Sequence, residues 1–416
     1  MNGGYPRKFK KSGVPDLKQR VDDLQGKIKL LRKERLYSYV APARQSHKVP
    51  PEVVEVPGTH FGDLTVSYLS SGANGVAYLA RGSFGTYVVK VPKTTRKDNP
   101  IREYLVGMEL NEYARYFPSI VKTEAVYGFK GNPENIRDVM STLKPIAESI
   151  HHTLSIKEAC ENAGHAVLFV HAVAGNPLKS YNKDEVFANH EMLGVLMQIY
   201  YTCFMLRKKF THHDLHCSNV LVHQPNPGKC IKFRFVFNTS DSKAKEVVEV
   251  KCSYHAQMVD YGRMYNEKVA RMVEEGIDLG ECNTRECGKE GENCGFAYRN
   301  SSHHYDKRNE SQDIRLLAEV YRQFGDHERG SNVLPVELLE LCKKVQFGHG
   351  TRDSSKRYFT KEQTREKNPD LPKELIFDVK DAIQALGTLC KSSPWLQCQD
   401  PVFHEVTVDG VHPFQR

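Results

Sequence analysis

The chain has 416 residues, of which 39% are hydrophobic, enough for one large core or two moderate ones. Its 59 basic and 51 acidic residues are interspersed, so the net charge of +8 indicates neither nucleic acid nor any other partner. Eleven scattered cysteines without an apolar N-terminal segment exclude a secreted disulfide framework and predict an intracellular protein. The longest mostly apolar run, Leu193 to Leu206, is shorter than the roughly 20 residues of a membrane span, so we expect a buried helix and no membrane.

Residues 1–41 are predicted to form a basic arm and a short amphipathic helix. The arm carries four basic residues and no acidic one within its start: Arg7, Lys8, Lys10 and Lys11. From Val14 to Leu31, apolar residues recur at three- and four-residue steps, a coiled-coil pattern that Gly26 weakens. This segment, 14–31, can pack on the protein itself or bind a coiled-coil partner, and the sequence leaves both open.

Residues 42–60 are proline-rich and are expected to be an extended linker, which places the start of the folded part near Phe61. Apolar residues then alternate in three short runs, a pattern typical of a β-meander: Leu64 to Tyr68, Val76 to Ala80, and Tyr87 to Val91. A glycine turn at 82–85 joins the second and third runs. The continuous apolar run from Ala166 to Ala172 predicts a buried strand.

Helical patterns dominate the remainder of the chain. They cover Ile101 to Tyr116, Asp184 to Lys209, Ser311 to Phe324, Pro335 to Val345 and Leu375 to Lys391. Alternating Phe and Val residues around a polar turn predict an elongated β-hairpin over about 224–258. We therefore expect an α+β fold with a small β-rich part over 61–170 and a larger helical part over 171–416.

Four features along the chain carry chemistry. The loop from Ser70 to Ala77 is rich in small residues, whose backbone can approach phosphate oxygens closely. Lys90 stands within the apolar strand Tyr87 to Val91, where a charge requires a partner or a bound anion. The segment His212-His213-Asp214-Leu215-His216-Cys217-Ser218-Asn219 and the later Val259-Asp260-Tyr261-Gly262 complete the set.

In this order the four features resemble the motifs of protein kinases. Gly72 and Gly75 match the second and third glycines of the Gly-rich loop, and Ser70 replaces the first. The resemblance implies a bilobal protein-kinase-like fold in which this loop and Lys90 bind ATP. It also implies a glutamate partner for Lys90 on the following helix. Counting back from the next strand favours Glu109, with Glu103 as the alternative.

The same resemblance assigns the catalytic roles. Asp214 would accept the proton of the acceptor hydroxyl, and Asn219 and Asp260 would bind Mg²⁺. Asp313, in the pattern Ser311 to Leu317, resembles a buried aspartate that ties down the backbone of the catalytic segment. The implied activity is transfer of the γ-phosphoryl group of ATP to a Ser or Thr hydroxyl of a protein substrate.

Two histidines depart from the usual pattern. His213 replaces the arginine before the catalytic aspartate, so we expect activity that does not depend on a phosphorylated activation loop. His216 replaces the lysine two residues after Asp214, which is similar to haspin-like kinases and to protein kinases of large DNA viruses. A viral origin would place the protein in the host cell or virion, and otherwise the cytoplasm or nucleus is expected.

Two other functions remain open. Asp214-Leu215-His216 is also similar to small-molecule kinases of the aminoglycoside and choline phosphotransferase type. A pseudokinase scaffold is the third reading, although the intact motif residues argue against it. The segment 260–310 contains no A-P-E motif, which typically supports binding of a protein substrate. It contains Cys282, Cys287 and Cys294, whose spacing fits a zinc site poorly and a glycine-rich loop better.

Overall fold

In this computed structural model of the chain, the described residues all belong to one unit, Pro51–Arg416. They are 52–54, 56, 59, 61–71, 75–92, 100–130, 132, 135–146, 166–173, 175–238, 245–274, 312–326, 331–345 and 374–409. The predicted helix at 14–31 and the three cysteines of the predicted loop, Cys282, Cys287 and Cys294, lie outside them.

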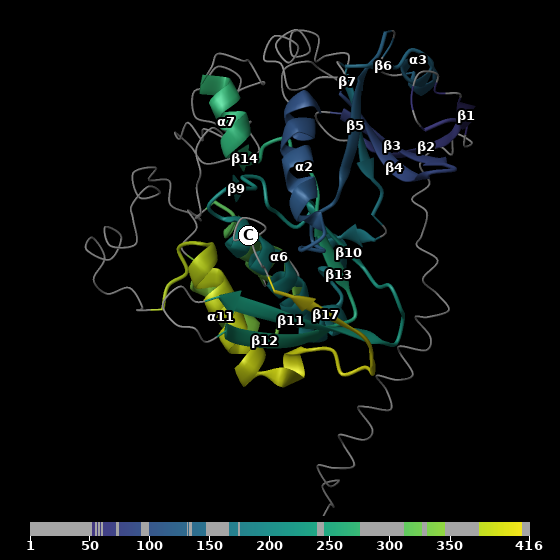
Figure 1. The fold of residues 1–416 in the computed structure, drawn as a ribbon. Helices are drawn as coiled ribbons and strands as arrows, with labels where there is room; N and C mark the ends of the chain where they lie inside the picture. The colour runs from purple at the N-terminus through teal and green to yellow at the C-terminus, as the bar shows by residue number, and fades with distance from the viewer. Residues whose placement is uncertain are drawn as a thin grey trace, which may run out of the picture. The chain divides into compact units, whose positions relative to one another are not determined.

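The first part of the unit is a seven-stranded sheet in which all neighbouring strands are antiparallel (Figure 1). Across the sheet the strands are β1 (Glu52–Val54), β2 (Leu64–Ser71), β3 (Gly75–Gly82), β4 (Gly85–Pro92), β7 (Ala166–His171), β5 (Thr123–Gly128) and β6 (Lys144–Pro145). The predicted meander is confirmed as β2, β3 and β4. Its alternating apolar residues bury one face of each strand.

The linker predicted over 42–60 is wrong for Glu52–Val54 and Val56. Glu52–Val54 forms strand β1, which pairs with β2 so that Val54 lies opposite Leu64. Val54 and Val56 are both buried in the core of the sheet. Prolines on either side do not prevent this, because an edge strand tolerates a missing N–H donor on its open side.

Strand β7 separates two hydrophobic clusters. Ala166 and Leu168 pack into the larger cluster, which includes the helices, whereas Val167 and Phe169 pack into the cluster of the sheet. Successive side chains of a strand point to opposite faces, so both faces of β7 are buried. This explains why its sequence is continuously apolar rather than alternating, and it confirms the predicted buried strand.

Helix α2 (Pro100–Ala114) packs against β5 and β7 (Figure 1). It begins at Pro100, where the missing N–H costs nothing because the first helical N–H groups have no intrahelical partner. A short helix, α3 (Ile136–Ser141), contacts β1. The position of α2 matters for the site because two of its charged residues, Arg102 and Glu103, are buried.

The single helix predicted from Asp184 to Lys209 is two helices. They are α5 (Glu185–His190) and α6 (Met192–Leu206), and they meet at Glu191. The backbone N–H of Ser253 donates to the buried Glu191 carboxylate at 2.7 Å, a tertiary contact that the helical pattern could not reveal. Helix α6 is buried along nearly all its length, as its apolar sequence predicts.

Short strand pairs position the segments after α6. Strand β10 (Val220–His223) lies between β13 (His255–Met258) and β8 (Asn176–Pro177), and β9 (Phe210–Thr211) pairs with β14 (Tyr265–Asn266). The β10–β13 pair brings the residue before β10 next to the residue after β13. Helix α7 (Glu267–Glu274) follows β14.

A hairpin lies within the predicted range 224–258, as β11 (Cys230–Asn238) and β12 (Lys245–Cys252), but β13, also in that range, pairs with β10 instead. Phe233 and Phe235 of β11 are buried in the larger cluster, where Phe235 contacts Tyr201 of α6, while Lys232 and Arg234 form ion pairs on the other face. Strand β17 (Val402–Val408) adds to β11 in parallel, which sequence patterns did not predict.

The remaining helices are α8 (Arg315–Phe324), α9 (Val336–Lys343) and α11 (Val379–Ser392). Two 3-10 turns cover Leu178–Tyr181 and Pro394–Leu396, and β15 (Gly325–Asp326) pairs with β16 (Ser331–Asn332). The described part of the chain is therefore a mixed α+β fold. Within it, no helix has the length and apolar character needed to cross a membrane.

Candidate active site

Lys90 is the cation of a three-residue ion group, which we call the Lys90 group: Lys90, Glu103 and Asp260. The Lys90 ammonium donates to Glu103 Oε1 at 2.6 Å and to Asp260 Oδ1 at 3.5 Å. Glu103 is 8% exposed and Asp260 is 42% exposed. The nearby Lys90 charge lowers the pKa of Asp260 below its usual range. The ion group therefore contains one buried carboxylate and one that faces solvent.

The pairing of Lys90 with Glu109 that the spacing favoured is wrong, and Glu103 takes that place. Glu109 instead pairs with Lys268 of α7 at 2.6 Å. Six residues turn an α-helix by about 600°, so the two glutamates face different directions. Counting failed because a turn at 113–120, with its own backbone hydrogen bonds, lengthens the connection from α2 to β5.

The described residues of the small-residue loop belong to the end of β2 and the start of β3. Ser70 is in β2 and pairs with Ala77, whereas Gly72 lies outside the described residues. At Gly75 a Cβ would come within 2.7 Å of the Val91 carbonyl oxygen, so close packing of β3 on β4 itself requires glycine. Ala77 also lies opposite Lys90 in the β3–β4 register, which places the start of β3 next to the Lys90 group.

The segment from His212 to Asn219 is a tight loop between β9 and β10. His213 has a φ of 60°, a left-handed conformation that is uncommon for a residue with a side chain. The Asn219 side-chain amide donates to the Asp214 carbonyl at 3.0 Å, and the Asn219 N–H donates to the His216 carbonyl at 2.9 Å. These bonds close the loop on itself and fix Asp214 and Asn219 relative to each other.

Three residues at the start of α8 hold this loop from outside, and we call them the α8 clamp: Asp313, Arg315 and Glu319. The Asp313 carboxylate accepts the N–H groups of His212 at 2.9 Å and His213 at 3.0 Å. Glu319 accepts the N–H of Cys217 at 2.7 Å. The predicted tie from Asp313 to the loop backbone is confirmed. Sequence analysis missed Glu319 and Arg315.

Asp214 lies at the centre of a second ion group, the Asp214 group: Asp214, Arg315 and Arg263. Arg315 donates to Asp214 Oδ1 at 2.8 Å, and Arg263 lies 4.0 Å from Oδ2. The Asp214 side chain is only 13% exposed. Burial raises the pKa of Asp214 to about 6, although the Arg263 and Arg315 charges oppose this shift. The carboxylate is therefore mostly ionised at pH 7.4.

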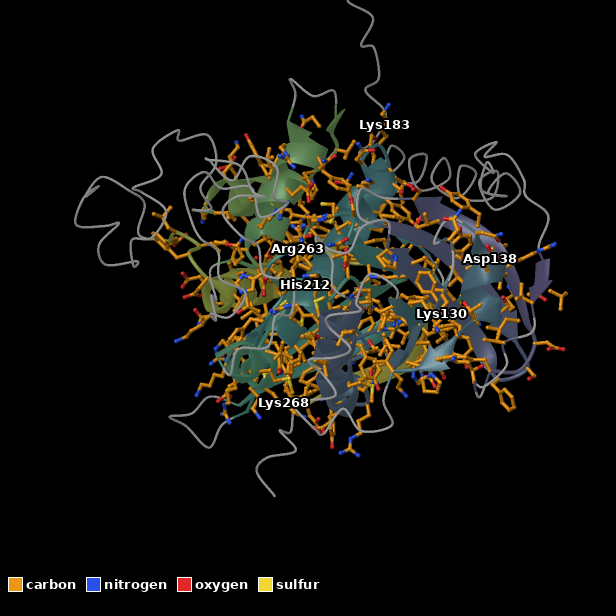
Figure 2. The ribbon with its side chains drawn as sticks, turned by 90° about the horizontal axis from the view of Figure 1, so that it is seen from above. Lys130, Asp138, Lys183, His212, Arg263 and Lys268 are labelled. Carbon is orange, nitrogen blue, oxygen red and sulfur yellow. The ribbon has the colours of Figure 1, made fainter. Side chains whose placement is uncertain are left out.

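The histidines of the loop supply no comparable positive charge. His216 Nε2 lies 3.7 Å from Asp214 Oδ1, but burial and the Arg315 charge lower the pKa of His216 to about 4. Burial likewise lowers the pKa of His212 to about 4. Both rings are neutral at pH 7. The cations beside Asp214 therefore come from α8 and from the segment after β13. Figure 2 labels His212 and Arg263 in the middle of the described residues.

Asn219 lies opposite Val259, the residue before Asp260, because the β10–β13 ladder continues for one more pair. The Val259 N–H donates to the Asn219 carbonyl at 3.0 Å. Among the described residues none donates to the Asn219 side-chain oxygen, which is therefore available with the partly exposed Asp260 carboxylate. Oxygen donors of this kind suit Mg²⁺, which usually takes one or two protein ligands together with phosphate oxygens and water. The described part of the chain contains no cluster of three or more His, Cys, Asp or Glu residues that could hold a metal.

Tyr261 stands at the phenylalanine position of the kinase motif that this segment resembles, and its side chain is buried. Its hydroxyl accepts the Val121 N–H at 2.8 Å and donates to the Met258 carbonyl at 3.0 Å. Its own N–H donates to Glu103 Oε1 at 3.3 Å, which links Tyr261 to the Lys90 group. Asp260, just before it, has a φ of 71°, so the backbone turns sharply at the site.

Comparisons with known proteins give a weak structural similarity. No protein-family model matches the chain, and no curated protein matches it either. A solved structure of a Plasmodium kinase domain is similar at 16% identity with a TM-score of 0.25; the match covers 49% of this chain and 52% of that one. The chain thus matches about half of that structure's length. At this level of similarity, conclusions about function depend on the side-chain geometry described above.

Proposed function

We propose that the chain is an ATP- and Mg²⁺-dependent Ser/Thr protein kinase with a bilobal kinase-like fold. The observation that carries the proposal is the meeting of Lys90, Glu103, Asp214, Asn219 and Asp260 in one site. They come from β4, α2, the loop before β10 and the segment after β13. Phosphoryl transfer requires mainly positioning and electrostatic stabilisation, and these five residues offer both.

The residues would divide the reaction as follows. Lys90, held by Glu103, would bind phosphate oxygens of ATP near the loop that contains Ser70 and Gly75. Asn219 and Asp260 would hold Mg²⁺, which neutralises the charge that develops on the phosphate oxygens. Asp214 would accept the proton of the acceptor hydroxyl. The hydroxyl oxygen would bond to the γ-phosphorus while the bond from that phosphorus to ADP breaks. The ionised state of Asp214 at pH 7.4 supports this role.

A small-molecule kinase is the second candidate. The Asp214-Leu215-His216 sequence and the neutral His216 ring beside Asp214 favour it, because a lysine at this position is typical of protein kinases. The nature of the acceptor separates the two candidates. A pseudokinase would bind partners without transferring phosphate to either kind of acceptor.

Radioactive transfer assays test the proposal. The purified full-length chain with Mg²⁺ and ATP labelled at the γ-phosphate should label Ser or Thr residues of mixed basic and acidic proteins. Asp214→Asn should reduce kcat by about 10²–10⁴-fold, the range for loss of a general base. Asp138→Asn makes the same chemical change on the exposed surface of α3 and should retain full activity (Figure 2).

Each alternative has its own result in this assay. Labelling of small alcohols alone would favour the small-molecule kinase. Absence of labelling on every acceptor, with Mg-ATP binding retained, would favour the pseudokinase. Undiminished transfer by the Asp214→Asn variant would show that Asp214 does not carry the reaction.

A further inference from the structure

The loop that would carry the catalytic base has histidines at the two positions where the kinase pattern has cations. His213 occupies the position of the usual arginine and His216 that of the usual lysine. The structure nevertheless surrounds Asp214 with positive charge. Arg315 and Arg263 come from two separate segments, and their side chains are 19% and 17% exposed.

Arg315 contacts a side chain of the loop, whereas the other members of the α8 clamp contact its backbone. Asp313 and Glu319 accept backbone N–H groups of the loop, whereas Arg315 contacts the Asp214 carboxylate itself. The bond of 2.8 Å is within the range for charge-assisted hydrogen bonds, which are about twice as strong as neutral ones. The clamp thus fixes both the backbone path of the loop and the direction of its carboxylate.

The two carboxylate oxygens of Asp214 have different surroundings. Oδ1 accepts the Arg315 hydrogen bond and also faces His216 Nε2 at 3.7 Å. Oδ2 faces Arg263 at 4.0 Å, beyond hydrogen-bond distance. Arg315 therefore occupies one oxygen and leaves the other for an incoming hydroxyl.

We infer that Arg315 is a positioning residue that orients the Asp214 carboxylate so that Oδ2 receives the proton of the acceptor hydroxyl. In this role it replaces the cations that the kinase pattern has at the positions of His213 and His216. The inference rests on the proposed function, since it concerns the base of that reaction. A purely structural ion pair is the competing explanation, because α8 also packs through its buried apolar face.

Steady-state kinetics on Arg315 variants of the full-length chain separates the two explanations. Arg315→Met keeps the length of the side chain and removes its charge and donors. We expect kcat to fall about 10–100-fold, the scale of a misplaced catalytic group, while KM for ATP changes less than about twofold. Arg315→Lys should recover at least about threefold of the lost kcat. Arg271→Met removes an exposed arginine of α7 and should leave kcat, KM and Tm unchanged.

The possible results decide the inference as follows. A kcat for Arg315→Met equal to the parent value overturns it, as does a rise in KM for ATP at constant kcat. If Arg315→Met fails to fold, Arg315→Gln takes its place: a lower kcat at constant KM for ATP supports the inference, and full kcat overturns it. If the parent chain transfers no phosphoryl group to any acceptor, the proposed function itself fails and the inference falls with it.

Discussion

The Lys90 group and the Asp214 group have opposite charge patterns. In the first, a lysine lies between two carboxylates; in the second, a carboxylate lies between two arginines. The first group is partly open to solvent, with Asp260 42% exposed, whereas all three side chains of the second are less than 20% exposed. An open group can exchange its internal contacts for those of a charged ligand. An enclosed group keeps its contacts and holds one side chain in a fixed direction.

The physical cost of each arrangement differs accordingly. Burial raises the pKa of Asp214 and disfavours its ionised form. The charges of Arg263 and Arg315 oppose this effect and stabilise the carboxylate. Asp260 has a lowered pKa because Lys90 lies beside it. We interpret the Lys90 group as the place where ligand phosphates and a metal would bind, and the Asp214 group as the place where a proton would be transferred.

Breaking the Lys90 group should reduce activity strongly. Glu103→Gln keeps the shape of the side chain but removes the negative charge that pairs with the Lys90 ammonium at 2.6 Å. We expect kcat/KM for ATP to fall about 10²-fold, the scale for misplacement of a group at the site. Initial-rate kinetics at varied ATP concentration measures this.

Glu109→Gln is the matched control for that change, since it alters the same residue type on the same helix. Glu109 pairs with Lys268 at the surface, where ion pairs contribute about 0–1 kcal/mol. Its kcat/KM should stay within about twofold of the parent value. A larger loss for Glu109→Gln than for Glu103→Gln would show that Glu109, and not Glu103, is the functional partner of Lys90.

Loosening the Asp214 group through its backbone should affect stability more than substrate binding. Asp313→Ala leaves two buried N–H groups, those of His212 and His213, without their acceptor. Each such loss costs about 1–3 kcal/mol, so the free energy of unfolding should fall by about 2–6 kcal/mol. Urea unfolding followed by fluorescence or circular dichroism measures it. Unchanged stability would mean that water or a backbone shift replaces Asp313.

Much of the fold follows from local sequence patterns. Strands β2 to β4 and the β11–β12 hairpin were predictable because their apolar residues alternate, and helix α6 because its apolar run is long. Strand β1 was not, since it has only three residues in a proline-rich segment, and β17 was not, since its partner β11 lies far away in the chain. The break between α5 and α6 was missed for the same reason: Glu191 bonds to Ser253, far away in the chain.

The site divides in the same way. Lys90, Asp214, Asn219 and Asp260 could be chosen because their residue types and order match known chemistry. Arg315 and Arg263 could not, because a charged residue near a helix start or after a turn ordinarily faces solvent. Their clue was indirect: a loop with histidines at both cation positions needs positive charge from another part of the chain.

Nucleotide binding tests the central claim most directly. Isothermal titration of the full-length chain with ATP, with and without Mg²⁺, measures whether the Lys90 group and Asn219 form one nucleotide site. We predict Mg²⁺-dependent binding that Lys90→Met and Asp260→Asn each weaken at least about tenfold, a change of about 1.4 kcal/mol. Absence of ATP binding by the parent chain would contradict the account. So would an affinity for Mg-ATP in either variant equal to that of the parent chain.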